Sequence, residues 1–132
     1  MDVVIDTNVL VSALWSRSSK PAIILNAIIA RRLRACYDYR IINEYREVLN
    51  RPKFHFPKWQ IEYLLDSIIK EGISVIPEPL PHVAFTDESD KKFYEAAKFC
   101  NALLITGNTR HYPQDMAVIT VADFCDLYLN KQ

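Results

Sequence analysis

The chain has only two glycines, Gly72 and Gly107, among its 132 residues. A phosphate-binding loop and a dinucleotide-binding fingerprint each need several closely spaced glycines, so both kinds of nucleotide site are excluded. The three cysteines, Cys36, Cys100 and Cys125, are an odd number, lie far apart in the sequence and lack the spacing of metal ligands. We expect them to be reduced thiols, buried among apolar neighbours.

The chain also lacks an excess of charge and a long apolar run. Its 16 basic and 16 acidic side chains cancel, so any contact with nucleic acid must come from local patches and not from a bulk positive charge. No apolar run approaches the length of a membrane-spanning helix, and the sequence does not begin with a signal segment. With half of its residues hydrophobic, the chain is predicted to fold as one domain over residues 1–132, in the cytoplasm and without membrane contact.

Apolar runs that are typical of strands alternate with helical patterns along the chain. Strands are expected at residues 3–5, 35–37, 73–76, 102–106 and 117–119. Helices are expected at residues 9–14, 22–32, 40–50, 57–71 and 90–100, and from 120 to about 130, with a proline-rich loop at 77–85. This alternation predicts an α/β fold, a three-layer α/β/α sandwich with a parallel sheet of four to five strands. Only the last two strands have a spacing that allows a hairpin.

Polar residues follow two of the buried strands, at the point where each strand ends. Asp6, Thr7 and Asn8 come directly after the first strand, and Asn108 comes shortly after the fourth, which ends at Thr106. Ligands of open α/β sheets bind at the carboxyl ends of the strands, so these residues are candidates for a functional site. The alternative is that Asp6 only caps the following helix, and the positions of the other acids bear on this choice.

Two further carboxylates lie at the borders of apolar helix faces. At about 100° per residue, Glu44 falls beside the apolar stripe of its helix, and Asp90 falls beside the apolar face at the start of another. Each position also has an ordinary explanation: an ion pair with Arg40 or Arg51 for Glu44, and the favourable dipole of a helix N-terminus for Asp90. On the same helix as Asp90, Glu95 is expected to face solvent.

Together these carboxylates predict a metal site. Asp6, Glu44 and Asp90 would repel one another if they converged at one edge of the sheet without matching cations. A hard divalent cation with oxygen ligands removes this conflict, and Mg²⁺ or Mn²⁺ is the usual occupant of such a site. Because no cysteine or histidine lies nearby in the sequence, zinc is a poor fit.

The segments that carry these residues resemble the PIN-domain ribonucleases. The resemblance rests on residues 4–13 (VIDTNVLVSA), on Asn43-Glu44 with Val48-Leu49, and on residues 87–93 (DESDKKF) and 104–113 (LITGNTRHYP). It covers almost the whole chain, in order, and is greatest to the VapC-like toxins of bacterial toxin–antitoxin pairs. It implies a PIN-like parallel sheet, Mg²⁺- or Mn²⁺-dependent cleavage of RNA, a homodimer and an antitoxin protein as partner.

By this resemblance, the catalytic acidic quartet of the family falls on Asp6, Glu44, Asp90 and position 108. The first three are the expected metal ligands, whereas Asn108 replaces the usual aspartate and removes one charge that would help to hold a second metal ion. The polar residues that line the site of the family correspond to Thr7, Asn8 and Thr106.

Basic and aromatic side chains near these acids are candidates for binding the RNA substrate. Phosphates could be held by Lys91, Lys92 and Arg110, and unpaired bases could stack on Tyr37, Tyr39 and His111. The alternative assigns the two lysines to the solvated surface and the two tyrosines to core packing, and for these four residues we favour the alternative.

Three aromatic residues, Phe54, Phe56 and Trp59, surround a break in the helical pattern that is rich in lysine and proline. At least one of them is expected to pack against the core. The others are predicted to form an exposed surface for an antitoxin peptide or a second subunit.

Two other functions remain open from the sequence. An aspartate-dependent phosphatase also places an aspartate at the tip of its first strand, but it needs a second acid two residues later, where Asn8 stands. A non-catalytic PIN-like module that only binds RNA or protein is favoured by Asn108 alone. An assay for metal-dependent cleavage distinguishes the binding module from the nuclease.

Overall fold

A five-stranded parallel sheet forms the centre of the computed structural model, which describes residues 1–129. Its strands are β1 (Asp2–Ile5), β2 (Arg34–Tyr37), β3 (Ile73–Ser74), β4 (Leu103–Thr106) and β5 (Val118–Thr120), in the order β3-β2-β1-β4-β5. The hairpin that the sequence allowed for the last two strands is wrong, because β4 and β5 pair in parallel. The predicted parallel sheet is confirmed with five strands.

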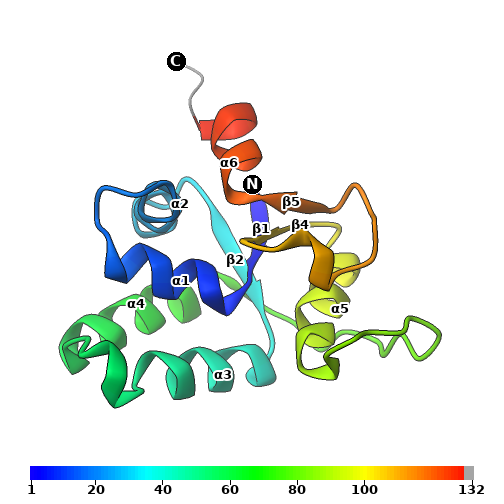
Figure 1. The fold of residues 1–132 in the computed structure, drawn as a ribbon, viewed down its shortest axis with the longest axis horizontal. Coiled ribbons are helices and arrows are strands. Elements are labelled where there is room, and N and C mark those ends of the chain that lie inside the picture. The colour runs from blue at the N-terminus through cyan, green and yellow to red at the C-terminus, as the bar shows by residue number, and fades with distance from the viewer. Residues whose placement is uncertain (130–132) are drawn as a thin grey trace.

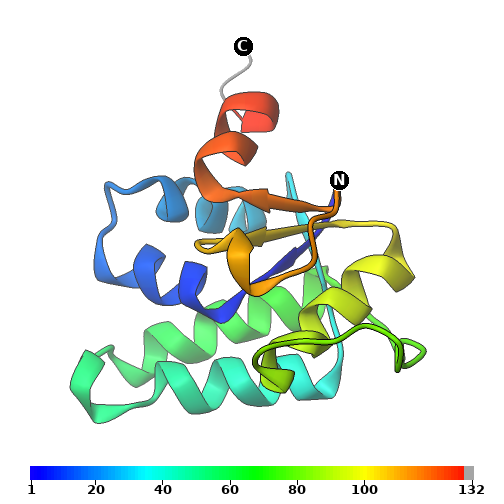
Figure 2. The same cartoon turned by 45° about the vertical axis from the view of Figure 1, so that its right-hand side comes forward.

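Helices cover both sides of this sheet, which confirms the predicted α/β sandwich. They are α1 (Thr7–Trp15), α2 (Lys20–Ile29), α3 (Tyr39–Leu49), α4 (Lys58–Glu71), α5 (Lys91–Cys100) and α6 (Val121–Phe124). Helix α5 packs against β1, β2 and β4 and lies across the sheet from α1 and α2 (Figure 1), as the view turned by 45° also shows (Figure 2). None of the helices in the described part of the chain is long and apolar enough to cross a membrane.

Local geometry explains where the elements differ from the sequence prediction. Helix α2 stops at Ile29 and not at residue 32, because Arg31 adopts a left-handed conformation with φ of 64°. Strand β3 has two residues instead of four, and Ile76 beyond it is 91% exposed. After α6 the chain continues as a π-helical turn to Leu129. Residue 130, where the last helix was expected to end, lies outside the described residues.

The cysteines are all free, as expected for reduced thiols. Cys36 and Cys125 are buried, which confirms the prediction for these two. Cys100 is only half-buried because it stands in the last turn of α5, so the prediction of full burial is wrong for this residue.

The strand order determines where a site can form. From β1 the chain runs outward through β2 to β3, and it then returns to place β4 on the other side of β1. The edge between β1 and β4 is therefore the point at which the strand order reverses, and ligands of open α/β sheets bind at such a point. Asp6 follows β1 there, and its backbone N–H donates to the Ile105 carbonyl at 3.0 Å.

Candidate active site

Asp6 is fixed in one orientation at the carboxyl end of β1. Its side chain is almost fully buried, and Oδ2 accepts hydrogen bonds from Thr106 Oγ1 at 2.8 Å and from Tyr112 Oη at 3.0 Å. Asp6 occupies the N-cap position of α1, but its side chain makes no capping hydrogen bond. The interpretation of Asp6 as a simple helix cap is therefore wrong.

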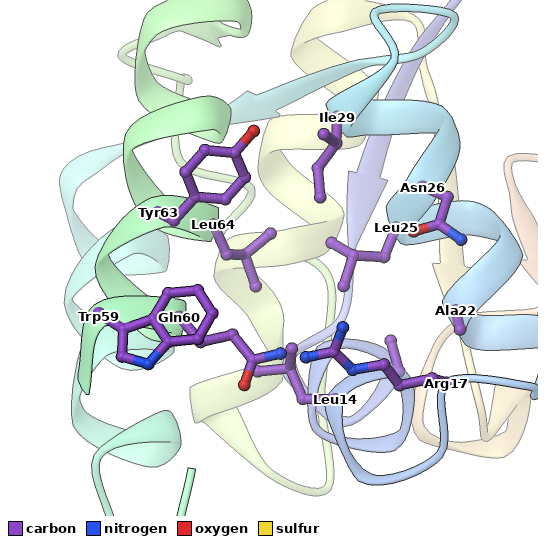
Figure 3. Close-up of a pocket in the computed structure, with 11 residues that line it drawn as sticks. Leu14, Arg17, Ala22, Leu25, Asn26, Ile29, Trp59, Gln60, Tyr63 and Leu64 are labelled. Atoms are coloured by element: carbon purple, nitrogen blue, oxygen red, sulfur yellow. The ribbon is translucent and has the colours of Figure 1, made fainter. Parts of the chain in front are cut away.

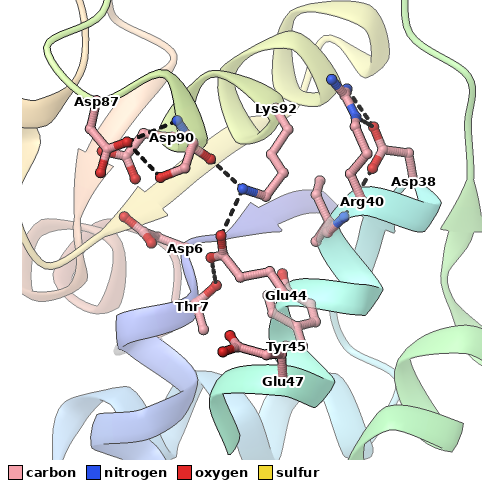
Figure 4. A network of polar contacts seen from close by, with 12 residues as sticks. Asp6, Thr7, Asp38, Arg40, Glu44, Tyr45, Glu47, Asp87, Asp90 and Lys92 are labelled. Atoms are coloured by element: carbon pink, nitrogen blue, oxygen red, sulfur yellow. Dashed lines mark hydrogen bonds and ion pairs between the residues drawn. The ribbon is translucent and has the colours of Figure 1, made fainter.

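Glu44 reaches the same edge of the sheet from α3. Thr7 Oγ1 donates a hydrogen bond to Glu44 Oε2, and Lys92 Nζ lies 2.7 Å from Oε1 (Figure 4). Arg40 and Arg51, which would explain Glu44 as an ordinary surface ion pair, bind other carboxylates instead. Glu44 is thus part of a network that is joined to the segment next to Asp6.

Asp90 contributes a third carboxylate, from the N-terminal end of α5, where it also makes no capping hydrogen bond. Desolvation, followed by the negative charges of Asp6 and Asp87, raises the pKa of the Asp90 carboxyl to about 6, and Glu44 adds to this shift. The imidazole of His111 lies beside it, with Nδ1 3.7 Å from Oδ2. Asp90 therefore stands in a poorly hydrated position where the charges of Asp6 and Asp87 disfavour its ionised form.

Asn108 lies beyond β4 and connects with the acids through two neighbours. Its backbone N–H donates to Thr106 Oγ1 at 3.1 Å, and the same hydroxyl donates to Asp6. Its side-chain nitrogen lies 3.1 Å from His111 Nε2, on the ring that faces Asp90. Asn108 Oδ1 accepts the backbone N–H of Arg110 at 3.1 Å, so it caps the short turn that follows.

A comparison with models of protein families identifies the family of this chain. The family model described as the PIN domain matches residues 2–110, which include all the acids described above. The chain belongs to the PIN-domain family. PIN domains are generally nucleases and typically bind divalent metals. Comparisons with curated proteins and with solved structures found no match.

The PIN fold brings together most of the residues that the sequence indicated. Asp6, Thr7, Glu44, Asp90 and Thr106 surround one site, and Asn108 borders it. Asn8 is exposed on the first turn of α1, Lys91 lines a hollow beside the acids together with Arg40 and Glu88, and Arg110 lines another hollow with His82 and His111.

The structure overturns the favoured assignment of Lys92 and Tyr39 and confirms that of Tyr37. Lys92 is only 12% exposed and binds Glu44, so its assignment to the solvated surface is wrong. Tyr37 packs in the core, as favoured, and donates to the Ile69 carbonyl at 2.8 Å. Tyr39 is 76% exposed at the start of α3, so core packing is wrong for this residue.

Sequence reasoning missed Tyr112 and misplaced Glu95. Tyr112 is buried against Asp6, and no local pattern indicates that contact, which joins residues 106 positions apart. Glu95 was expected to face solvent, but it is buried, pairs with Arg40 at 3.0 Å and accepts the Leu80 backbone N–H at 3.0 Å. The proline-rich loop covers this face of α5, which the helical pattern alone cannot indicate.

The donors of the PIN site suit a hard divalent cation. Within residues 1–129, no three acidic, histidine or cysteine side chains are arranged as a ready metal cage. The two carboxylate oxygens of Glu44 contact Thr7 and Lys92. Both hydrogen bonds to Asp6 go to Oδ2, so Oδ1 accepts none from the described part of the chain. A free carboxylate oxygen and a neighbouring repelled carboxyl, that of Asp90, fit an oxygen-binding ion such as Mg²⁺ or Mn²⁺.

The raised pKa of Asp90 predicts a pH-dependent loss of stability in the metal-free protein. An aspartate has an ordinary pKa of 3.8 in the unfolded chain, against about 6 in the folded one. Between these values the folded chain holds the proton and the unfolded chain does not, so the free energy of unfolding falls as the pH rises, and it levels off above about pH 6. Urea unfolding with a chelator present should show Asp90→Asn gaining stability relative to the natural chain between pH 4 and 6. Parallel pH profiles of the two proteins would contradict the assignment.

Proposed function

We propose that this PIN domain is a divalent-metal-dependent endoribonuclease that hydrolyses phosphodiester bonds of RNA in the cytoplasm. One observation carries the proposal: Asp6, Glu44 and Asp90 come from three different elements and lie near one another where the strand order reverses. Thr7, the residue after Asp6, binds Glu44, and desolvation together with the charge of Asp6 raises the pKa of Asp90. A purely structural cluster would be expected to pair its acids with cations, whereas here Asp6 and Asp90 lack a lysine or arginine partner in residues 1–129.

The chain's own residues would prepare the site before any RNA arrives. Asp6 and Asp90 would hold Mg²⁺ or Mn²⁺, with Glu44 beside them. The bound ion would supply the charge that activates a water molecule and stabilises the leaving oxygen. Thr106 and Tyr112 hold Asp6 by Oδ2, and Oδ1 accepts no hydrogen bond within residues 1–129. Asp6 is therefore held in one orientation before the reaction begins.

RNA would cross the site between two hollows that flank the acids. One hollow is lined by Arg40, Lys91 and Lys92 together with three glutamates, and the other by residues that include Arg110 and His111. Lys91 and Arg110 would contact phosphates, which position the strand without reading its sequence. Tyr39 is exposed near the first hollow and would offer a face for an unpaired base.

Incubation of the chain with single-stranded RNA and Mg²⁺, Mn²⁺ or a chelator tests the proposal. Cleavage that needs the metal supports it, and Mn²⁺ should act at lower concentration than Mg²⁺ because it generally binds such ligands more tightly. RNA binding without cleavage at any metal concentration would favour the non-catalytic module. Release of phosphate from a small phosphate ester, without cleavage of RNA, would favour the phosphatase.

We also propose that the nuclease is the toxin of a toxin–antitoxin pair. Helices α1, α2 and α4 enclose a pocket of about 290 Å³ with Trp59 and Tyr63 at its rim and Arg17 in its lining (Figure 3). Trp59 is 72% exposed, whereas Phe56 packs against the core, as predicted for at least one of the three aromatic residues. Exposed aromatic rings beside a cation suit an antitoxin peptide with apolar and acidic side chains. A homodimer is part of this proposal, and light scattering tests it.

Replacing Asn108 with aspartate should tighten metal binding. Asn108 Oδ1 already accepts the Arg110 N–H, and a carboxylate oxygen can take the same bond, so the turn should be unchanged. The added negative charge should increase the affinity for Mn²⁺ about tenfold, or about 1.4 kcal/mol, and leave cleavage equal or faster. Calorimetric titration of Asn108→Asp and the natural chain measures this. Equal affinities would show that position 108 does not act on the metal site.

A further inference from the structure

Lys92 is held in place by the site itself. Its Nζ lies 2.7 Å from Glu44 Oε1 and also donates to the backbone carbonyl of Ser89, while its side chain is only 12% exposed (Figure 4). Glu44 is 25% exposed, so the pair is partly shielded from water and screened less than a surface pair. A lysine fixed between a carboxylate and a carbonyl oxygen is a permanent positive charge beside the acids.

Lys92 occupies one of the three carboxylates that are proposed to hold the metal. Asp6 and Asp90 have no lysine or arginine partner within residues 1–129, so their two negative charges are left for one divalent cation, and Asn108 adds no charge. Asp87 adds a negative charge outside this set, and its carboxylate accepts hydrogen bonds from Ser89. Among the three proposed ligands, a second divalent ion would find no further carboxylate unless it displaced Lys92 from Glu44.

We propose that Lys92 takes the place of a second metal ion: it positions Glu44 and limits the site to one divalent cation. This inference rests on the proposed metal-dependent nuclease and adds the number of its metal ions. Lys92 is a positioning residue here, since it acts on the metal site through Glu44. Thr7 donates a hydrogen bond to the other carboxylate oxygen of Glu44, so both oxygens of Glu44 are held.

Calorimetric titration with Mn²⁺ tests the inference without any measurement of cleavage. The natural chain should bind one Mn²⁺, whereas Lys92→Gln, which frees Glu44, should bind two. Lys92→Arg restores the charge and should return the count to one. Lys91→Gln is the matched control: it removes the same charge one residue earlier, at a side chain that lines the same hollow but is not the lysine paired with Glu44, and should bind one Mn²⁺.

The results of this titration distinguish failure of the inference about Lys92 from failure of the proposed nuclease function. A single Mn²⁺ site of unchanged affinity in Lys92→Gln, or loss of Mn²⁺ binding by that variant, overturns the role of Lys92 and leaves the nuclease proposal standing. Failure of the natural chain to bind Mn²⁺ overturns the metal-dependent function itself. If Lys92→Gln does not fold, electron paramagnetic resonance of the natural chain saturated with Mn²⁺ tests the inference instead. The spectrum should be that of an isolated Mn²⁺ ion. The spectrum of two coupled Mn²⁺ ions would overturn the inference.

Discussion

Asp6→Asn is expected to abolish RNA cleavage while the chain keeps its fold. The amide has nearly the same size, and its oxygen can still accept the hydrogen bonds of Thr106 and Tyr112. What the substitution removes is the negative charge at the centre of the site. We expect kcat/KM for RNA to fall by at least about 10³-fold, or about 4 kcal/mol of transition-state stabilisation.

The same substitution should make the metal-free protein equally stable or more stable. Asp6 contributes to the raised pKa of Asp90, and its neutral replacement relieves that repulsion. Thermal unfolding by circular dichroism measures the stability, and the pKa of Asp90 should move toward its ordinary value. Glu47→Gln is the control, because Glu47 is exposed, lies on α3 with Glu44 and pairs with Arg51, so its cleavage rate should not change. Unfolding of Asp6→Asn, or normal cleavage by it, would show that the acids are structural.

The fold could be predicted because its main signals are local. Val3, Val4 and Ile5 form a continuous apolar run, which is typical of a strand covered on both faces, and all three residues are indeed fully buried. Asp38 directly precedes α3, and its side chain accepts the Ile41 backbone N–H at 3.0 Å, as an N-cap aspartate does. Strand β3 was overestimated: Val75 still donates its backbone N–H to the Tyr37 carbonyl of β2 at 2.9 Å, but Ile76 is 91% exposed beyond the end of the strand.

The acids of the site could be found from the sequence, but their partners could not. Asp6 is placed by strand geometry and Glu44 by helical periodicity, and both rules act within one element. Lys92 and Tyr112 are placed by how whole elements pack: Lys92 meets Glu44 because α5 lies next to α3, and Tyr112 meets Asp6 because the chain turns back after β4. Such contacts depend on the tertiary arrangement, so the sequence suggested only a phosphate contact or the solvated surface for Lys92 and indicated no role for Tyr112.

Gly72→Ala should cost more stability than any substitution on the exposed surface. Gly72 ends α4 with φ of −91°, so it is not required for a left-handed turn. It is required for space: a Cβ built there would lie 2.3 Å from the Ala35 carbonyl oxygen and 2.4 Å from the Ile68 carbonyl oxygen. Both obstacles are backbone atoms of packed elements, so neither can rotate away as a flexible side chain would.

Relieving this clash requires α4 to move away from β2, and β3 follows Gly72 directly. The movement would disturb the pairing of Cys36 with Ile73 at one edge of the sheet. We expect a loss of about 3 kcal/mol, at the upper end of the cost of overpacking, and a melting temperature lower by about 10 °C. Gly107→Ala is the matched control, because a Cβ at Gly107 meets nothing within 4 Å and its φ is not positive. Its stability should change by no more than about 0.5 kcal/mol, so equal losses in the two variants would contradict the close approach of α4 and β2.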